Sequence, residues 1–440
     1  MSTSKDESAI FAQHESTVRS YCRRFPMVIE RACGSYLYDT NGTRYIDFLS
    51  CAGSVNYGHN PPELKAELLK YLLSDGIQAA LDMHTVAKRE FIDAFYQTIL
   101  KPRQMDYRLQ FTGPTGTSVI ESAVKLARKV TGRKNVVAFT NGFHGMSGTS
   151  LGLTGNRYHR QQVQDTHVTR IPYDGYLPGD VDSVSYLRKL LVDSSSGIDI
   201  PAAVVLETVQ GEGGINVASV QWLRDLRALT SEYGILLIID DIQAGCGRTG
   251  QFFSFEFADI QPDLVCLSKS LSGFGLPFSL LLIAPQHDKW QPAEDNGTFR
   301  GNNLAFVSAT AALWLFWSDQ KLQRDIQRRE KMVQTVLHRL AEQFPNVIAD
   351  VRGRGLFYGM ECVDPTMADS IAQECLRQHL IIERCGGEDQ VLKLMPALTI
   401  DDAILSAGLE IIANAVATCV KRAEALIDVQ CREAVAFAAT

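Results

Sequence analysis

One lysine in this 440-residue sequence stands where an amine could act as a nucleophile. Lys269 follows the apolar segment 264–267 and precedes a loop with two glycines, residues 270–277. If 264–267 is a buried strand of an open parallel sheet, Lys269 lies at its carboxyl end, where such sheets bind their ligands. Partial burial there lowers the pKa of an amine, which can then form a Schiff base with a carbonyl group. The alternative is a structural lysine whose stem leaves the strand end and whose ammonium reaches water.

A second cluster places two carboxylates at the end of another apolar segment. Asp240 and Asp241 follow residues 235–239, and Gln243 comes two residues later. Carboxylates at the end of a core strand are costly unless a cation meets them. The protonated ring nitrogen of a pyridine cofactor would be such a cation, with Asp240 as its partner and Gln243 near a neighbouring ring substituent. A pair of helix N-caps is the alternative.

A third cluster could hold a phosphate group. Gly116 and Thr117 come directly before an amphipathic helix that the apolar spacing predicts over residues 118–130. The free N–H groups and the dipole at the start of a helix attract anions. The spacing matches neither the P-loop nor the dinucleotide-binding fingerprint, and a plain helix cap is the alternative.

A fourth cluster, Phe143 and His144, follows the apolar segment 136–139. Phe143 could stack on a flat ring, although ordinary turn packing is the alternative. His144 could stack, make a hydrogen bond or be structural, and no histidine spacing in the sequence predicts a metal site. Taken together, the phosphate cradle, the aromatic ring, the aspartate and the lysine are what pyridoxal 5'-phosphate requires.

Apolar and amphipathic segments alternate through the middle of the chain and would position these clusters. The segments 136–139, 202–206, 235–239, 264–267 and 279–283 are almost continuously apolar, which is typical of strands buried on both faces. Helical patterns over 118–130 and 221–233 lie between them. The alternation predicts an α/β fold with a mostly parallel sheet and helices on both faces.

The two ends of the chain follow a different pattern. Residues 36–48 predict a hairpin around an Asn-Gly turn. After a predicted helix over 319–344, short strands near 356–361 and 391–395 alternate with helices over 366–380 and 401–427. We therefore expect a smaller α+β domain built from residues 1–75 and 329–440, and a large domain formed by residues 76–328.

Composition narrows the classes of protein further. Fifty acidic and 43 basic residues give a formal charge of −7, which disfavours a nucleic-acid-binding protein. The apolar stretch 305–317 is shorter than the ~20 residues of a membrane helix and predicts a buried helix instead. The N-terminus has no secretion signal, and the ten cysteines include no Cys-x-x-Cys pair, so reduced thiols packed in the core are expected. These features predict a cytoplasmic enzyme without a membrane or nucleic-acid partner.

The motifs resemble the class III (ω-amino) aminotransferases, a family of fold-type I enzymes that use pyridoxal phosphate. Residues 207–214 are similar to the Glu-Pro-x-Gln-Gly-Glu block of the family, and residues 239–250 to its block from Asp-Glu to Gly-Arg-Thr-Gly. Residues 268–269 and 298–303 complete the set, and matching motifs run from about residue 35 to 400. Within the family, segments such as 57–60, 81–83 and 296–306 are similar to the diaminobutyrate–2-oxoglutarate enzymes.

The resemblance implies a role for each cluster. Lys269 would form the Schiff base with the cofactor and carry protons at the substrate. Asp240 would pair with the ring nitrogen and Gln243 would contact the phenolate oxygen. Phe143 would stack on the ring, with His144 also at the cofactor. The amides of Gly116 and Thr117 would bind the phosphate, together with Thr298 of a neighbouring subunit, which implies a homodimer or a higher homo-oligomer with shared sites.

Two positions depart from the family pattern. Lys393 stands where ornithine- and γ-aminobutyrate-type members carry an arginine, which would pair with Glu212 and meet a substrate carboxylate. A lysine holds a carboxylate as a point charge and not bidentately. Asp241 stands where the family usually has glutamate.

The resemblance also implies a reaction. The terminal amino group of a diamino acid, best L-2,4-diaminobutyrate, would pass to 2-oxoglutarate and leave aspartate semialdehyde. The alternatives are another donor, such as ornithine, lysine or a further ω-amine, and a decarboxylase or aminomutase with the same fold.

Overall fold

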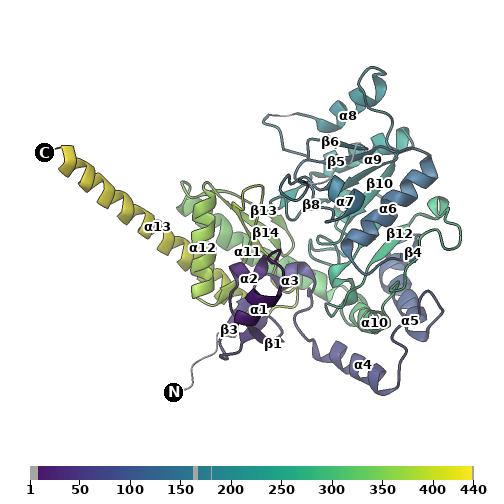
Figure 1. Ribbon diagram of the computed structural model, residues 1–440, viewed down its shortest axis with the longest axis horizontal. Helices are drawn as coiled ribbons and strands as arrows, with labels where there is room; N and C mark the ends of the chain where they lie inside the picture. Colours follow the sequence, from purple (N-terminus) through teal and green to yellow (C-terminus); the bar gives the residue numbers. More distant parts are fainter. Residues whose placement is uncertain (1–7, 162–166, 180, 439–440) are drawn as a thin grey trace.

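A seven-stranded sheet forms the centre of the computed structural model, which describes residues 8–161, 167–179 and 181–438, with the backbone alone for 426–438 (Figure 1). The strand order is β4-β12-β11-β10-β7-β5-β6, and β12 runs antiparallel to both its neighbours while the other pairs are parallel. The strands are β4 (Arg108–Phe111), β5 (Val136–Phe139), β6 (Val168–Ile171), β7 (Ala203–Leu206), β10 (Leu236–Asp240), β11 (Leu264–Leu267) and β12 (Leu280–Ile283). The predicted mostly parallel sheet is therefore confirmed.

Helices cover both faces of this sheet because its strands are apolar on both faces. Alternate residues of one strand enter two different cores: Leu237 belongs to the core that includes Trp222 of α9 (Val220–Glu232), whereas Leu236 belongs to the core that includes Ala123 of α6 (Gly116–Thr131). The helix α8 (Ser183–Val192) lies beside α9, and α7 (Gly148–Leu153) lies beside α6. Gly132 ends α6 in the left-handed conformation that favours glycine.

A second group of helices lies at the β4 side of the sheet. It consists of α4 (Pro62–Leu73), α5 (Val86–Phe95) and α10 (Asn303–Trp317), with α10 in contact with the other two (Figure 1). The prediction of a buried helix over 305–317 was only half right. One side of α10 is buried, but Trp314 and Leu315 on the other side are 47% and 46% exposed.

Two small sheets lie outside the large one, and the first of them combines strands from both ends of the chain. One has the order β1-β2-β3-β15, with β1 (Ile29–Cys33), β2 (Tyr36–Asp39), β3 (Arg44–Asp47) and β15 (Leu380–Ile381). The other has the order β13-β14-β17-β16, with β13 (Ile348–Arg354), β14 (Phe357–Cys362), β17 (Val391–Leu394) and β16 (Glu383–Cys385). The pairing of β2 with β3 confirms the predicted hairpin, and the parallel pairing of β3 with β15 ties the N-terminal segment to the C-terminal one.

The described residues at the two ends of the chain also form six helices. They are α1 (Ala9–His14), α2 (Tyr21–Arg24), α3 (Ser50–Gly53), α11 (Lys321–Gln343), α12 (Pro365–Arg377) and α13 (Asp402–Ala438). The nine cysteines with described side chains are free thiols, six of them buried, and Cys431 lies outside the described side chains. The short β8 (Val209–Gln210) and β9 (Asn216–Val217) pair with each other near the large sheet.

The long helix α13 is more apolar than we expected, because the sequence analysis predicted no segment of membrane-spanning length. Over Asp402–Ala425 it is long and apolar enough, by length and composition alone, to cross a membrane, and it is the one such helix in the part of the chain that the structure describes. Its residues Leu405, Leu409, Ile412 and Val416 are buried, and the helix packs against α11 and α12. These contacts bury one side of the helix against the C-terminal elements.

Candidate active site

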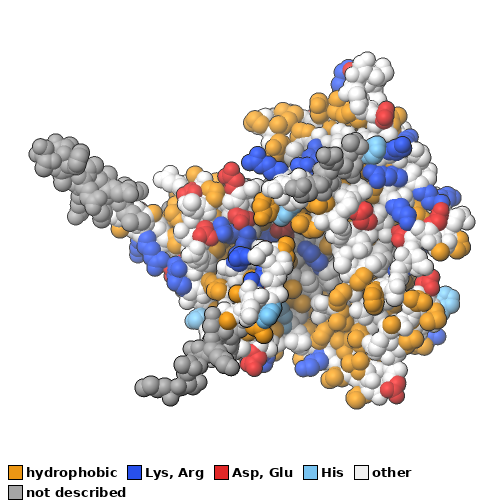
Figure 2. Space-filling view, viewed as in Figure 1, with side chains coloured by type: hydrophobic (Ala, Val, Ile, Leu, Met, Phe, Trp, Pro, Cys, Tyr) orange, Lys and Arg blue, Asp and Glu red, His pale blue; other side chains and the backbone are white. Residues whose placement is uncertain are grey.

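Three neighbouring strands carry ionisable side chains to one edge of the large sheet. Lys269 follows β11, Asp240 ends β10 and Glu207 follows β7, and these strands are adjacent in the order β11-β10-β7. Because the three strands are parallel, their carboxyl ends lie at the same edge. Figure 2 shows the surface hollowed between the large-sheet body and the elements of the two chain ends.

Lys269 begins a short 3-10 helix, Lys269–Ser272, and its backbone has a left-handed φ of +50°. Burial lowers the pKa of its amine below the ordinary range of lysine. The charge of Lys393 acts in the same direction, while the carboxylates of Glu212, Glu383 and Asp240 act against it. The amine therefore loses its proton more readily than an exposed lysine would, which is the direction that the sequence predicts.

Asp240 and His144 form a buried pair. Oδ2 of Asp240 lies 2.8 Å from Nδ1 of His144, and both residues are less than 5% exposed. Burial lowers the pKa of His144, but the hydrogen bond and the charge of Asp240, with the charge of Glu207, outweigh burial and raise it overall. Of the roles left open for His144, the structure therefore shows hydrogen bonding to Asp240.

Glu207 ties two loops of the site together. One carboxylate oxygen accepts a hydrogen bond from Phe143 N at 2.9 Å and the other from Gly211 N at 3.0 Å. Burial raises the pKa of Glu207 to about 7, and the charge of Asp240 also raises it, while His144 opposes the shift. Glu207 therefore fixes the loop that carries Phe143 against the turn that leads to Glu212.

Gln243 and Glu212 are hydrogen-bonded to each other in the site. Nε2 of Gln243 donates to the Ala52 carbonyl at 3.0 Å and to Oε1 of Glu212 at 3.3 Å. Burial alone would raise the pKa of Glu212, but the ammonium groups of Lys393 and Lys269 lower it to about 2. Glu212 is therefore a carboxylate at neutral pH, with a side chain that is 32% exposed.

Lys393 is paired more completely than the sequence predicts. Its ammonium lies 2.7 Å from Glu212, as expected, and also 3.0 Å from Glu383 on β16. Tyr21 of α2 donates a hydrogen bond to the other oxygen of Glu383 at 2.8 Å. The Lys393 side chain is fully buried, so in this arrangement it offers no surface to a substrate carboxylate.

Gly116 and Thr117 lie in the first turn of α6, capped by the Thr115 side chain, which accepts a hydrogen bond from Ser118 N. Their N–H groups have no intrahelical acceptor at this position. A Cβ atom at Gly145 would lie 2.8 Å from Thr117 Oγ1 and 2.5 Å from Ser150 Oγ, so the backbone here approaches the start of the helix closely. Free N–H groups at the start of a helix are the feature that a phosphate site requires.

The structure does not bring Thr298 into the hollow of its own chain. Thr298 is exposed in the loop before α10, and its neighbour Phe299 is 72% exposed. Asp241 also faces away from the hollow, because its carboxylate accepts hydrogen bonds from Ser254 N. Among the described residues, no group of three or more His, Cys, Asp or Glu side chains could hold a metal ion.

Sequence reasoning missed two residues of this site. Glu383 follows the apolar residues 380–382, but it lies within β16 of a small sheet and not at the carboxyl end of a large-sheet strand, so the rule that found Asp240 does not apply to it. Tyr21 had no signal either, because it reaches Glu383 from the other end of the chain.

Comparison with known proteins shows the family to which the chain belongs. The sequence pattern described as aminotransferase class-III matches residues 18–416. The chain belongs to the class III aminotransferases. Diaminobutyrate–2-oxoglutarate transaminase from Bordetella parapertussis is 52% identical over 411 residues, which cover 93% of this chain and 94% of that relative. A transaminase of the same name from Vibrio cholerae is 53% identical over 405 residues, or 92% of this chain and 98% of the relative.

The fold agrees with solved structures of aminotransferases. Ornithine aminotransferase from Toxoplasma gondii has a TM-score of 0.83 over 96% of this chain and 97% of that one, at 25% identity. The present chain, as a class III aminotransferase, depends on pyridoxal phosphate, and its candidate site fits that cofactor. A buried carboxylate, an amine with a lowered pKa and a close-fitting helix start converge there.

Proposed function

We propose that this class III aminotransferase moves the terminal amino group of L-2,4-diaminobutyrate to 2-oxoglutarate, giving aspartate semialdehyde and glutamate. The observation that carries the proposal is the identity of 52–53% to transaminases named for these substrates, over more than nine-tenths of both chains. The presence of the full set of strand-end residues supports it.

We assign the catalytic amine to Lys269. Pyridoxal phosphate supplies an electron sink when it is bound, and the protein must supply the proton transfers. Because burial lowers the pKa of Lys269, a larger fraction of its amine is unprotonated at neutral pH and able to accept a proton from the substrate carbon. Glu212 stays ionised near it and provides a compensating charge.

The remaining residues would hold the cofactor. Asp240, fixed by His144, would face the ring nitrogen, and Gln243 would contact the ring oxygen. Phe143, whose N–H is held by Glu207, would cover the ring. Gly116 and Thr117 would bind the phosphate through backbone N–H groups.

We also propose a homodimer in which Thr298 of each subunit completes the phosphate site of the other. Hydrophobic side chains gather over α4, α5 and α10, at the lower right of Figure 2. Those on α4 and α10 are about half exposed or more: Leu69, Leu72, Leu73, Trp314 and Leu315. Exposed apolar patches of this kind are typical of subunit interfaces.

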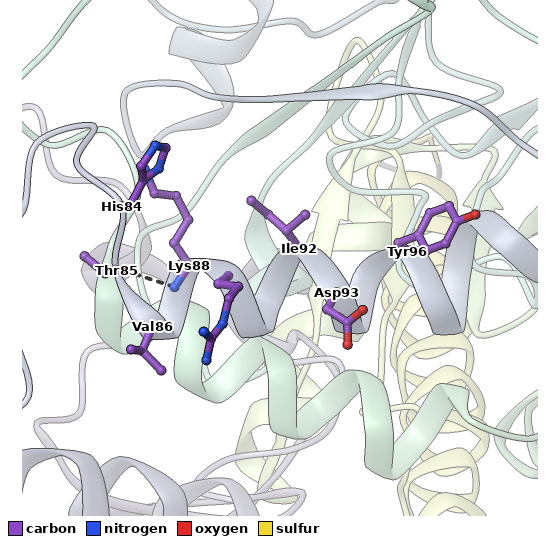
Figure 3. A pocket seen from close by; sticks show the side chains of 8 residues that line it. His84, Thr85, Val86, Lys88, Ile92, Asp93 and Tyr96 are labelled. Carbon is purple, nitrogen blue, oxygen red and sulfur yellow. Dashed lines mark hydrogen bonds between the residues drawn. The ribbon is translucent and has the colours of Figure 1, made fainter.

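A groove of about 610 Å³ runs along α5 within the same surface (Figure 3). Its lining includes Val86, Ile92 and Tyr96, which are 61%, 39% and 48% exposed. The loop with Thr298 leads directly into α10, so a second copy seated on this surface would meet that loop. This arrangement supports an interface that contains Thr298.

Two further predictions belong to the same proposal. The division into a large domain, residues 76–328, and a small domain from residues 1–75 and 329–440 is supported by the β3–β15 pairing. A cytoplasmic location is supported by the free thiols of the nine described cysteines.

An amino-donor screen tests the function. The purified protein with pyridoxal phosphate receives 2-oxoglutarate and one donor, either diaminobutyrate, ornithine, lysine or γ-aminobutyrate, and glutamate and carbon dioxide are measured. Ornithine is one methylene longer than diaminobutyrate, so it should react about 10- to 200-fold less efficiently. A preference for another donor would overturn the substrate assignment, and carbon dioxide without glutamate would overturn the reaction.

A further inference from the structure

A strained turn from the N-terminal segment lies against the site. Ser50, Cys51, Ala52 and Gly53 have φ values of 48°, 51°, 54° and 83°, so four successive residues are left-handed and three of them are not glycine. Each non-glycine residue in this conformation costs free energy, and such residues persist only where their surroundings hold them.

Hydrogen bonds hold the turn from both sides. Before it, Oδ1 of Asp47 accepts from Leu49 N at 2.8 Å and from Ser50 N at 3.0 Å. After it, the Gly53 carbonyl accepts from the Ser270 hydroxyl at 2.6 Å. The Ala52 carbonyl accepts from Gln243. The last two carbonyls of the turn, those of Ala52 and Gly53, are therefore bonded to side chains of the candidate site.

Ser270 is the residue directly after Lys269, and its hydroxyl is bonded twice. It donates to Gly53 and accepts from Asn56 N at 2.9 Å. Ser268, on the other side of Lys269, donates to the Phe278 carbonyl at 2.9 Å. Both serines are at most 5% exposed, so Lys269 lies between two buried and hydrogen-bonded neighbours.

Lys269 itself needs this support. Its φ of +50° is left-handed, a conformation that glycine adopts easily and lysine does not. In this conformation the amine is buried, and the charges of Glu212, Lys393, Glu383 and Asp240 act on its pKa. A relaxed backbone would turn the side chain away from these groups.

We propose that Ser270 is a positioning residue, whose bonds to Gly53 and Asn56 hold Lys269 in its left-handed conformation and aim its amine into the site. The Ser50–Gly53 turn is then part of the catalytic apparatus, although it lies more than two hundred residues from Lys269 in sequence. This inference rests on the proposed role of Lys269 and is independent of the amino donor.

Ser270→Ala tests the proposal, with Ser272→Ala as its matched control. Ser272 lies in the same 3-10 helix and is fully buried, but its hydroxyl has no hydrogen-bond partner among the described residues. In the protein freed of cofactor, the rate at which an acylating reagent labels Lys269 is followed by mass spectrometry against pH. Attachment of added pyridoxal phosphate to Lys269 is then trapped with borohydride.

Ser270→Ala should raise the apparent pKa of the Lys269 amine and slow both reactions, whereas Ser272→Ala should match the wild type. A rise of one pKa unit reduces the reactive fraction about tenfold at pH values below the pKa. If both variants have the same Lys269 pKa and attachment rate while the wild type still attaches the cofactor, the role of Ser270 is overturned and the proposed function is not. If pyridoxal phosphate does not attach to Lys269 in the wild type, the proposed function is overturned as well.

Thermal unfolding and circular dichroism of both variants show whether they fold. If Ser270→Ala does not fold, Ser270→Cys decides instead, because a thiol has nearly the same shape but is a weak donor. It should shift the Lys269 pKa in the same direction by a smaller amount, and an unchanged pKa in a folded Ser270→Cys protein would contradict the proposal.

Discussion

Nζ of Lys393 lies 2.7 Å from Oε1 of Glu212, and none of the Lys393 side chain reaches solvent. The same ammonium forms an ion pair with Glu383, which is 3% exposed, so one buried cation is paired with two carboxylates. The charges of Glu212 and Glu383 outweigh burial and raise the pKa of Lys393 well above its ordinary value. Lys393 is therefore a buried cation between Glu212, in the turn after β8, and Glu383 on β16.

Lys393→Met should destabilise the protein by about 3–5 kcal/mol, because it leaves Glu383 buried without a cation. The free energy of unfolding in urea measures the loss. Lys393→Met combined with Glu383→Gln should recover much of it, since the buried charge is then gone. Arg188→Ala, which breaks the exposed pair with Glu232, should leave stability close to that of the wild type. Wild-type stability of Lys393→Met would contradict the buried ion pair.

Gly211→Ala should displace the Gln243 side chain. A Cβ atom at Gly211 would lie 1.8 Å from Oε1 of Gln243, so the amide must leave its bonds to Ala52 and Glu212. If Gln243 contacts the cofactor ring, the absorption band of bound pyridoxal phosphate should shift and its Kd should rise. Gly387→Ala is the control, because its Cβ would meet no atom within 4 Å. An unchanged absorption band in Gly211→Ala would argue against a role for Gln243 at the cofactor.

Asp241→Asn should change how stability depends on pH. Burial raises the pKa of the Asp241 carboxyl to about 7, and the charge of Asp240 adds to the shift, although hydrogen bonds from Ser254 oppose it. The folded protein thus keeps a proton that the unfolded chain releases near pH 4. Stability contributed by this group falls as pH rises through the window between these values, and the loss is complete above about pH 7.

Because asparagine does not ionise, Asp241→Asn should gain stability relative to the wild type between pH 5 and 8, on the order of a few kcal/mol. Its carbonyl can still accept from Ser254 N. Denaturant unfolding across this pH range measures the difference, and the exposed Asp259→Asn serves as the control. A difference that stays constant with pH would contradict the raised pKa of Asp241.

Mixing two inactive variants tests the shared site. Lys269→Ala removes the proposed amine, and Thr298→Asp places a negative charge where the partner's phosphate would bind. In a mixed dimer one site would carry both changes and the other would carry neither. Refolding the two variants together in equal amounts should therefore restore about one quarter of the wild-type activity. If the mixture stays inactive while each variant still dimerises, Thr298 does not act across the interface.

The parts of the site that follow core strands were predictable from the sequence. Continuous apolar segments identify strands buried on both faces, and a polar residue directly after such a segment must lie at the edge of the sheet. This rule found Lys269 and Asp240, whereas Glu383 lies inside β16 of a small sheet and is outside its reach. Phe143 and the start of α6 followed from the same pattern of strands and helices.

Other features depended on contacts between distant segments. No local preference predicts that Ser50, Cys51 and Ala52 become left-handed, since none of them favours that conformation without outside support. Tyr21 reaches Glu383 across most of the chain. The burial of Lys393 between two carboxylates likewise depends on how β16 and β17 pair.

The parallel pairing of β3 with β15 has a consequence for synthesis of the protein. Ile46 leaves the ribosome long before its partner Leu380 is made. At about 5–20 residues per second, the first three strands would wait roughly tens of seconds for the strand that completes their sheet. A nascent chain therefore carries an unfinished edge through most of its translation, where chaperones would have their longest opportunity to bind.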